Sequence, residues 1–400
     1  MRRSRVVAAL VPLVAAVLVA PAATAVADPV PSAGRPAGWT TMPTAPLSGD
    51  TSQEVFRQVA VVPGGAAFAT GWTRHDLPGV SEVRTLVERF DGGTWEAMVT
   101  PDVETAPAAD YLWGISGSSA TDVWAVGRSA TAPGRPTAVP LALHWDGMSW
   151  SKVPVPDPSG GAGADMSAVV SLGPDDVWAV GTAYPLEAHG AAYHWDGRAW
   201  SAARLPRLAG CKDTNFTELL AITATPAGEV YAGGDCPTPS GYSGFVARMT
   251  GLRAWDVVAR VPGRSAVAGM TSDAAGTVWV TGTRSADTWT RPYLLSGAGT
   301  TWTVRYRPLT TDGTTEQAAG VAVTPTGVTI VGERDTSRGQ RAPFGATWRP
   351  DGTWQRLDIP APSDTAWLVA IGGSATGPVW AMGQYLGDRA RIVGFAARPA

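Results

Sequence analysis

The chain has 400 residues, 44% of them hydrophobic and 16% charged, so it can bury a sizeable core and is neither a disordered nor a fibrous sequence. Its formal net charge of −3 offers no basic surface for a phosphate backbone, so nucleic acid is excluded as an expected partner. The 47 glycines and 33 prolines follow no short period and indicate many tight turns between short strands.

The first 27 residues have the pattern of a secretory signal peptide. A basic segment (residues 1–5) precedes an apolar stretch (residues 6–20) and the small-residue site Ala25-Val26-Ala27. The apolar stretch is too short to span a membrane, and no second hydrophobic span follows it in the sequence. We therefore expect cleavage near Ala27, export without membrane insertion, and a flexible, Pro-rich lead-in over residues 28–37.

After the lead-in, a short apolar run that closes on glycine recurs seven times, at intervals of 48 to 56 residues. The two clearest copies read Asp122-Val-Trp-Ala-Val-Gly127 and Asp176-Val-Trp-Ala-Val-Gly181. A fixed period near fifty residues indicates stacked supersecondary units. The closing glycines are Gly71, Gly127, Gly181, Gly234, Gly282, Gly332 and Gly383.

A tryptophan is a second anchor, because it opens the last strand of each unit. Between the two anchors one unit reads as four strands, which in the second unit are residues 112–116, 123–128, 141–145 and 150–155. A four-stranded antiparallel sheet, repeated radially, is the blade of a β-propeller. The anchoring tryptophans are Trp39, Trp95, Trp150, Trp200, Trp255, Trp302 and Trp354.

The two ends of the repeat array predict how it closes. After Gly383 the chain supplies only one further strand, residues 391–398, so the seventh unit lacks its outer strand. Residues 38–43 read as an outer strand without a blade of its own. We expect these segments to pair, which closes the ring and removes its exposed edges. The predicted fold is therefore an all-β, seven-bladed β-propeller with four antiparallel strands per blade, forming one domain over residues 38–400.

The units resemble kelch and galactose-oxidase-type propeller repeats. Val230-Tyr-Ala-Gly-Gly234 matches the glycine doublet that follows the second strand of such blades, and Trp145-Asp146-Gly147 matches their aromatic-Asp turn. The resemblance implies a propeller over residues 38–398. The sequence departs from the copper-radical oxidases, which need a tyrosine cross-linked to cysteine together with histidine ligands. We therefore expect no such activity, no cofactor and no metal site.

Cys211 and Cys236 are the only cysteines of the chain. Export favours a disulfide bond between them, and the repeat places both at the same end of one hairpin. Ligation of a metal by the two thiolates alone is the weaker alternative.

Three Asp-Gly-x-x-Trp sequences begin at Asp91, Asp146 and Asp196. They are similar to the aspartate boxes of sialidases, but the spacing from Asp to Trp is four residues instead of five and the preceding serine is absent. We interpret them as tight hairpin turns followed by a buried indole, at the outer rim.

Candidate binding residues come from the starts of the inner strands. Counting sixteen residues back from each closing glycine reaches positions next to the axis, on the face that usually holds the ligand of a propeller. Three carboxylates and two aromatic rings at one mouth are suited to a cation, an amine or a glycan; the alternative is a rim of solvated side chains. The positions are Val55, Tyr111, Asp165, Glu218, Ala266, Glu316 and Trp367, with Arg57 two residues after the first.

Two further tryptophans, Trp72 and Trp289, follow closing glycines and are expected in loops of the same face. Exposed aromatic rings in such loops stack on sugar rings or anchor protein partners. The alternative is that they pack beneath a long loop.

The predicted function is a secreted, monomeric, non-catalytic binding module that recognises a glycan, a small ligand or a protein on its loop-rich face. The alternative is an exported carbohydrate-active enzyme, a glycoside hydrolase or lyase, in which Glu218 works with Asp165 or Glu316. Two carboxyl groups that converge within about 5–10 Å would favour hydrolysis. A structural envelope protein is a third possibility, since a propeller fold alone does not define an activity.

Overall fold

The computed structural model describes residues 24–26, 37–46, 49, 51–101, 109–130, 138–184, 189–205, 208–212, 217–239, 241–286, 289–308, 314–336 and 339–400. Most of the expected leader and lead-in lies outside these ranges. One piece of the expected leader, β1 (Thr24–Val26), pairs in parallel with the outer strand β22 (Thr301–Tyr306), which the sequence did not predict. Within the described ranges, no helix has the length and apolar character needed to cross a bilayer.

The described chain is all-β, as predicted. Its strands form sets in which each strand pairs antiparallel with the next one along the chain. The sets are β3–β6 (Thr51–Val61, Ala67–Leu77, Val80–Phe90, Trp95–Ala97), β7–β10 (Ala109–Ser119, Asp122–Ala130, Val139–Trp145, Trp150–Val153), β11–β14 (Ala168–Gly173, Asp176–Ala183, His189–Trp195, Trp200–Arg204), β15–β18 (Glu218–Ala224, Val230–Thr238, Gly241–Gly251, Ala254–Arg260), β19–β22 (Ser265–Ser272, Val278–Ala286, Trp289–Ala298, Thr301–Tyr306) and β23–β26 (Glu316–Thr324, Gly327–Asp335, Arg341–Trp348, Trp354–Asp358).

A further set combines both ends of the chain. The strands β27 (Ala366–Gly373), β28 (Val379–Leu386) and β29 (Ile392–Pro399) are followed in space by β2 (Ala37–Pro43). β2 pairs antiparallel with β29, with Trp39 opposite Pro399 and Met42 opposite Ala396. Short parallel contacts link this set to its neighbours, so the described strands include one continuous sixteen-stranded sheet.

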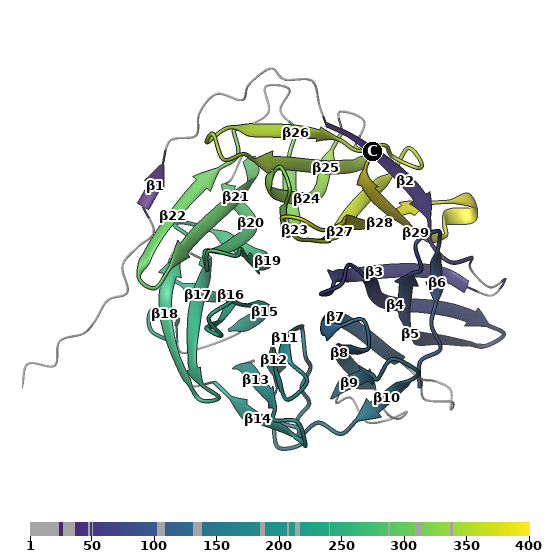
Figure 1. The fold of residues 1–400 in the computed structure, drawn as a ribbon, viewed down its shortest axis with the longest axis horizontal. Coiled ribbons are helices and arrows are strands. Elements are labelled where there is room, and N and C mark those ends of the chain that lie inside the picture. The colour runs from purple at the N-terminus through teal and green to yellow at the C-terminus, as the bar shows by residue number, and fades with distance from the viewer. Residues whose placement is uncertain are drawn as a thin grey trace, which may run out of the picture.

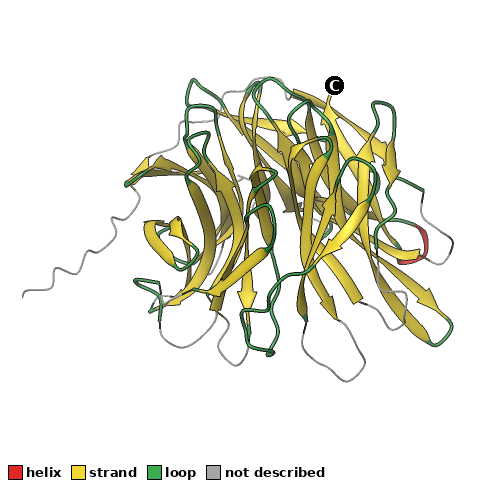
Figure 2. Ribbon diagram, turned by 60° about the horizontal axis from the view of Figure 1, so that its bottom comes forward, coloured by secondary structure: helices red, strands yellow, loops and turns green. Residues whose placement is uncertain are grey.

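The sets are arranged around a central opening, with the first strand of each set innermost and the last strand outermost (Figure 1). Figure 2 shows that strands account for nearly all of the regular structure, with one short helical segment, η1 (Asp388–Ala390). The axis of the ring is therefore lined by β3, β7, β11, β15, β19, β23 and β27.

The closing glycines recur because the inner strand approaches them closely. A Cβ atom on Gly127 would overlap the carbonyl oxygen of Tyr111, and a Cβ on Gly234 would overlap that of Glu218. A larger residue would push the first and second strands of the set apart. The oxygen atoms that meet the other closing glycines belong to Val55, Asp165, Ala266, Gln317 and Trp367.

Most inner strands contain a β-bulge immediately after this contact. The pairing of β3, β7, β15, β19, β23 and β27 with its second strand skips one residue. A bulge redirects the side chain of the unpaired residue. The skipped residues are Arg57, Trp113, Leu220, Ala268, Ala319 and Val369, and all of them line the axial cavity.

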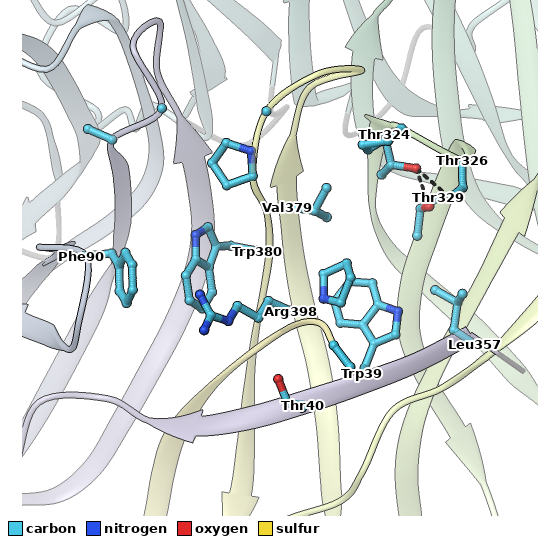
Figure 3. Close-up of a pocket in the computed structure, with 18 of the residues that line it drawn as sticks. Trp39, Thr40, Phe90, Thr324, Thr326, Thr329, Leu357, Val379, Trp380 and Arg398 are labelled. Atoms are coloured by element: carbon cyan, nitrogen blue, oxygen red, sulfur yellow. Dashed lines mark hydrogen bonds between the residues drawn. The ribbon is translucent and has the colours of Figure 1, made fainter.

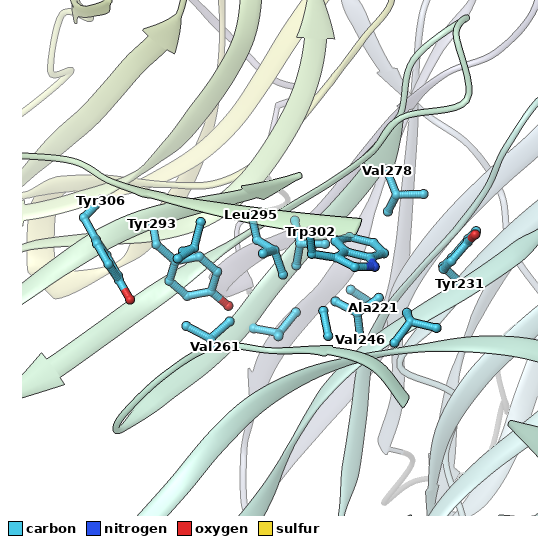
Figure 4. Close-up of a cluster of buried hydrophobic side chains, with 14 residues drawn as sticks. Ala221, Tyr231, Val246, Val261, Val278, Tyr293, Leu295, Trp302 and Tyr306 are labelled. Carbon is cyan, nitrogen blue, oxygen red and sulfur yellow. The ribbon is translucent and has the colours of Figure 1, made fainter. Parts of the chain in front are cut away.

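The core lies between neighbouring sets. In the cluster of Figure 4, Tyr231 and Val246 from the β15–β18 set pack against Val278, Leu295 and Trp302 from the β19–β22 set. All five are at least nine-tenths buried. Burying a large apolar side chain contributes about 1.5–3 kcal/mol, so each interface between sets adds substantially to stability.

Polar contacts also fasten the end of β2. Glu54 on β3 accepts hydrogen bonds from the Gly394 N–H (2.6 Å) and the Thr44 hydroxyl (3.2 Å), and Glu88 on β5 accepts one from the Ala45 N–H (3.2 Å). The two carboxyl groups also hydrogen-bond to each other. Both are buried, so the segment after β2 is attached to β3 and β5 by a pair of desolvated acids.

The predicted disulfide is present. Cys211 and Cys236 are bonded, with their Cα atoms 5.7 Å apart. The Lys212 N–H also donates to the Pro237 carbonyl (2.9 Å), so the segment before β15 is attached to β16.

The aspartates of the third hairpin in several sets cap their turns. Oδ1 of Asp91, Asp146 and Asp196 each accepts two backbone N–H groups of its own turn, and Asp351 accepts the N–H and hydroxyl of Thr353. These donors hold the pKa of each carboxyl below its usual value. The exposed aspartates therefore stabilise turns at the rim.

Candidate functional site

A cavity of about 510 Å³ occupies the centre of the ring. Its wall is polar where Arg57, Trp113, Asp165, Tyr184 and Glu218 contribute side chains, with Gln58, Ser167 and Thr182 beside them. The wall formed by β19, β23 and β27 is apolar, lined by Val267, Met270, Ala319, Val321, Val369 and Ile371. The volume lies within the range of about 300–1,000 Å³ that small-ligand sites occupy.

An aromatic cluster borders the polar wall. The ring of Trp72 on β4 meets the ring of Tyr111 edge-on at 5.6 Å, and Tyr111 lies 6.5 Å from Trp113. The Arg128 guanidinium is 5.0 Å from the centre of Tyr111 and 5.1 Å from that of Trp113. Stacking of this cation on both rings fixes the orientation of Trp113, whose bulge position on β7 brings it to the cavity.

Asp165 is the most strongly held carboxylate of the site. It is 3% exposed and accepts hydrogen bonds from the Tyr184 hydroxyl (2.8 Å) and the Thr182 N–H (3.0 Å). Burial raises its pKa, whereas these donors and the charge of Arg128 oppose the rise. The short segment before β11 is thus fixed against the end of β12.

Glu218 and Asp235 are opposite one another on β15 and β16. Asp235 is buried and accepts the Val267 N–H (2.8 Å); burial, together with the charge of Glu218, raises its pKa to about 7. Burial and the nearby Asp165 also raise the pKa of Glu218. Among the described residues, none donates a hydrogen bond to the Glu218 side chain, which leaves its carboxylate available to a ligand.

Arg57 extends from the bulge of β3 into the cavity. Its side chain is exposed to solvent within the cavity, and the protein packed around the cavity lowers its pKa. Its guanidinium makes no hydrogen bond or ion pair with any residue that the structure describes. The site therefore contains one unpartnered cation and one unpartnered carboxylate.

The structure brings together five of the predicted residues. Arg57, Asp165 and Glu218 line the cavity, and Tyr111 and Trp72 lie against its aromatic border. Trp72 belongs to strand β4 rather than to a loop, because the β4–β5 hairpin continues for six residues past Gly71.

Glu316 is displaced from the expected position. The residue equivalent to Glu218 in its set is Gln317, whose carbonyl meets Gly332, so the sixteen-residue count is one residue off here. Glu316 is instead buried and forms an ion pair with the buried Arg307 (3.1 Å). It stabilises a junction between sets and does not line the cavity.

The two remaining tryptophans do not add to the cavity wall. Trp367 is half-buried, with the Arg341 guanidinium 5.6 Å from its ring, and it is not among the lining residues. Trp289 begins β21 and pairs with Ala286, but its side chain lies outside the described part of the structure.

Sequence reasoning missed Trp113, Tyr184 and Thr182. Tyr184 follows the closing glycine Gly181 by three residues, which is the only sequence signal for its place at the mouth. Trp113 had no signal, because a bulge and not the strand alternation directs it inward. Within the described ranges, no cluster of three or more His, Cys, Asp or Glu side chains is suited to a metal ion.

A larger cavity, of about 1050 Å³, lies beside β2 and β28, between Trp39 and Trp380 (Figure 3). Several of its polar groups have other contacts: the hydroxyls of Thr324 and Thr329 bond to each other (3.1 Å), and the Arg398 guanidinium is 5.3 Å from the ring of Trp380. The axial cavity is the stronger candidate because two of its charged side chains, Arg57 and Glu218, line it without a partner among the described residues.

No family model matches the chain, and no curated protein matches it. Solved structures do. A protein of unknown function from Dyadobacter fermentans aligns with 92% of this chain and 99% of its own length, with 11% identity and a TM-score of 0.50. A puromycin hydrolase aligns with 90% of this chain and 56% of its own length, with 17% identity and a TM-score of 0.54. An ulvan lyase, a polysaccharide lyase, aligns with 90% of this chain and 93% of its own length, with 8% identity and a TM-score of 0.53. At these identities the similarity shows the fold alone, which is an all-β propeller.

Proposed function

We propose that this chain is an exported, monomeric, non-catalytic binding protein that holds a saccharide unit of a glycan in its axial cavity. The observation that carries the proposal is the convergence of an unpartnered Glu218 carboxylate, an unpartnered Arg57 guanidinium and the Trp113 ring on one cavity of about 510 Å³. Sites of this composition orient polyhydroxylated ligands, because charged groups fix hydroxyls and an aromatic face covers the apolar side of a sugar ring.

The proposal includes a complete ring of seven blades with kelch-like repeats, in which β2 supplies the last outer strand. Three findings support it: seven closing glycines meet the inner strand in the same way, β2 pairs with β29, and the Glu54–Glu88 pair holds the segment that follows β2. Export is supported by the leader pattern in the sequence and by the Cys211–Cys236 disulfide, a bond typical of oxidising compartments.

A carbohydrate-active enzyme is the second candidate. Asp165 and Glu218 lie close enough for the charge of Asp165 to raise the pKa of Glu218, and both pKa values are raised by burial. Two carboxyl groups in one cavity with perturbed pKa values are the arrangement that glycosidases use for acid–base chemistry. In an enzyme of this kind Glu218 is the proton donor, because Asp165 already accepts hydrogen bonds from the Tyr184 hydroxyl and the Thr182 N–H.

The test is a titration of the mature protein with a panel of neutral and acidic oligosaccharides, with wild type compared with Glu218→Gln and Trp113→Ala. The proposal expects at least one saccharide to bind, and each substitution to weaken its binding about tenfold or more, which corresponds to about 1.4 kcal/mol. Glu96→Gln, an exposed substitution on β6, is the matched control and should bind as wild type does.

Two outcomes would redirect the proposal. Time-dependent appearance of reducing ends or unsaturated products that Glu218→Gln abolishes would favour the enzyme. Absence of binding to every saccharide, in a protein whose thermal unfolding is cooperative, would reject glycan recognition at this site.

A further inference from the structure

We infer that the saccharide held in the axial cavity is a sugar acid, whose single carboxylate is bound by Arg57 while its hydroxyls donate to Glu218 on the opposite wall. This inference rests on the proposed glycan-binding function and names the substrate class of the same site. In Figure 1 the inner strands β3 and β15, which carry Arg57 and Glu218, lie on opposite sides of the central opening.

The surroundings of Arg57 show that its anion must come from outside the protein. On one side β27 presents Val369 and Ala370 to the cavity, and on the other side β7 presents Trp113. The two carboxylates of the cavity wall belong to more distant strands. Asp165 precedes β11, and Glu218 is the first residue of β15. Burial lowers the pKa of Arg57, and no neighbouring carboxylate contributes to this shift.

A guanidinium in this position favours a carboxylate ligand. The Arg57 side chain is exposed to the cavity and pairs with no described residue, so an anion that enters the cavity can approach it without displacing a protein partner. The planar fork of arginine matches the two oxygens of a carboxylate with two parallel hydrogen bonds. Because the bulge of β3 sets the direction of the side chain, the fork is presented to the axis before the ligand arrives.

The remaining wall limits the ligand to one negative charge. Glu218 and Asp165 would repel a second anionic group at the far side, so ligands with several phosphates or sulfates are disfavoured. The same carboxylates accept hydroxyl protons, and the hydroxyls of Ser167 and Thr182 add neutral partners. A ligand with one carboxylate at one end and several hydroxyls at the other fits these walls, and a uronic acid unit has this composition.

The test uses pairs of sugars that differ only in oxidation at C6: methyl glucuronoside against methyl glucoside, and methyl galacturonoside against methyl galactoside, each with its longer oligomers. Affinity is measured by calorimetry with the mature wild-type protein, Arg57→Met, Arg57→Lys and the control Arg253→Met. Arg253 is exposed in the turn between β17 and β18, far from the axis. Thermal unfolding of each variant verifies that it is folded.

We expect the acidic member of at least one pair to bind tenfold or more tightly than its neutral partner, with an advantage that shrinks as salt is raised. Arg57→Met should reduce this ratio to near one while changing the affinity of the neutral sugar less than twofold. Arg57→Lys, which keeps the positive charge but not the planar guanidinium, should retain part of the preference for the acidic sugar. Arg253→Met should keep all of it.

The failures are distinguishable. Neutral sugars that bind as well as acidic ones, or a preference that survives Arg57→Met, would overturn the sugar-acid inference and leave glycan binding intact. If neither member of any pair binds, the sugar-acid inference fails, and the wider oligosaccharide panel decides whether the proposed glycan binding fails as well. Glycine serves as a competitor: if it displaces the sugar acid at equal concentration, Glu218 selects an ammonium group and the ligand class is a zwitterion, which also overturns the inference.

Discussion

The buried carboxyl pair behind β2 should make this protein less stable as the pH rises. Glu88 accepts the Ala45 N–H and hydrogen-bonds to Glu54, which in turn accepts the Gly394 N–H. A hydrogen bond between two carboxyl groups needs a proton. This bond lowers the pKa of Glu54 and raises the pKa of Glu88, which places the proton on Glu88. The decisive substitution is Glu88→Gln, because the amide keeps a donor for Glu54 and an acceptor for Ala45 but has no proton to lose.

The magnitude follows from the difference between the folded and unfolded pKa values. Burial, with the added repulsion of Glu54, raises the pKa of Glu88 from 4.5 to about 9. Between these values the folded protein holds one proton more than the unfolded chain, so the free energy of unfolding falls by about 1.4 kcal/mol per pH unit. The stabilisation is complete below the unfolded value and is lost as the pH rises towards the folded value. From about pH 5 to about pH 8 the loss is at most about 4 kcal/mol, a large part of a typical total of about 5–15 kcal/mol.

The assay is urea unfolding followed by tryptophan fluorescence at several pH values across this window. The wild-type free energy of unfolding should decline with pH, and Glu88→Gln should reduce the slope by about 1 kcal/mol per pH unit. Asp235, with a pKa near 7, adds to the decline in both proteins and does not affect the difference. Glu96→Gln, at an exposed site on β6, should keep the wild-type slope. Equal slopes for wild type and Glu88→Gln would refute the reasoning.

Three further predictions concern the scaffold. Replacing Cys211 and Cys236 by alanine should lower the free energy of unfolding by about 3 kcal/mol, because the bond closes a loop with a sequence separation of 25; a loss well below 1 kcal/mol in urea titration would contradict this. Gly127→Ala should cost about 3 kcal/mol through overlap with the Tyr111 carbonyl, whereas Gly173→Ala, which has open space around it, should cost far less. Trp39→Ala should cost about 3–5 kcal/mol, since the indole is buried where β2 joins the ring, and an unchanged melting temperature would show that this pairing carries no stability.

The sequence predicted the strand sets well because their cause is local and repeated. Each closing glycine lies where no Cβ fits against the inner strand, so the same residue is required in every set. The strand ends were predicted less well. β4 continues to Leu77 and β16 to Thr238, beyond the apolar runs that mark them, because antiparallel pairing with the third strand continues through polar residues.

The site was predicted only in part, for geometric reasons. A fixed count back from the glycines reached Asp165 and Glu218, since both lie directly at the strand contact that the glycine permits. The same count failed at Glu316, because the spacing in that set is one residue shorter. Trp113 was not assigned to the axis, because a bulge changes the side-chain direction without altering the residue pattern.

The candidate site lies where the side chains of the repeat differ from one set to the next, and this has a physical reason. A ring of identical units would present the same side chains to a ligand from every side. Such a ring could not bind the different groups of an asymmetric ligand with different side chains. At the bulge positions Ala268 and Ala319 show that a small apolar side chain satisfies the fold, yet the equivalent residues on β3 and β7 are Arg57 and Trp113. The Arg57 guanidinium is exposed to the cavity and pairs with no described residue, so it adds no hydrogen bond or ion pair to the ring. Stability therefore does not explain Arg57, which supports the proposal that it binds an anionic group at the axis.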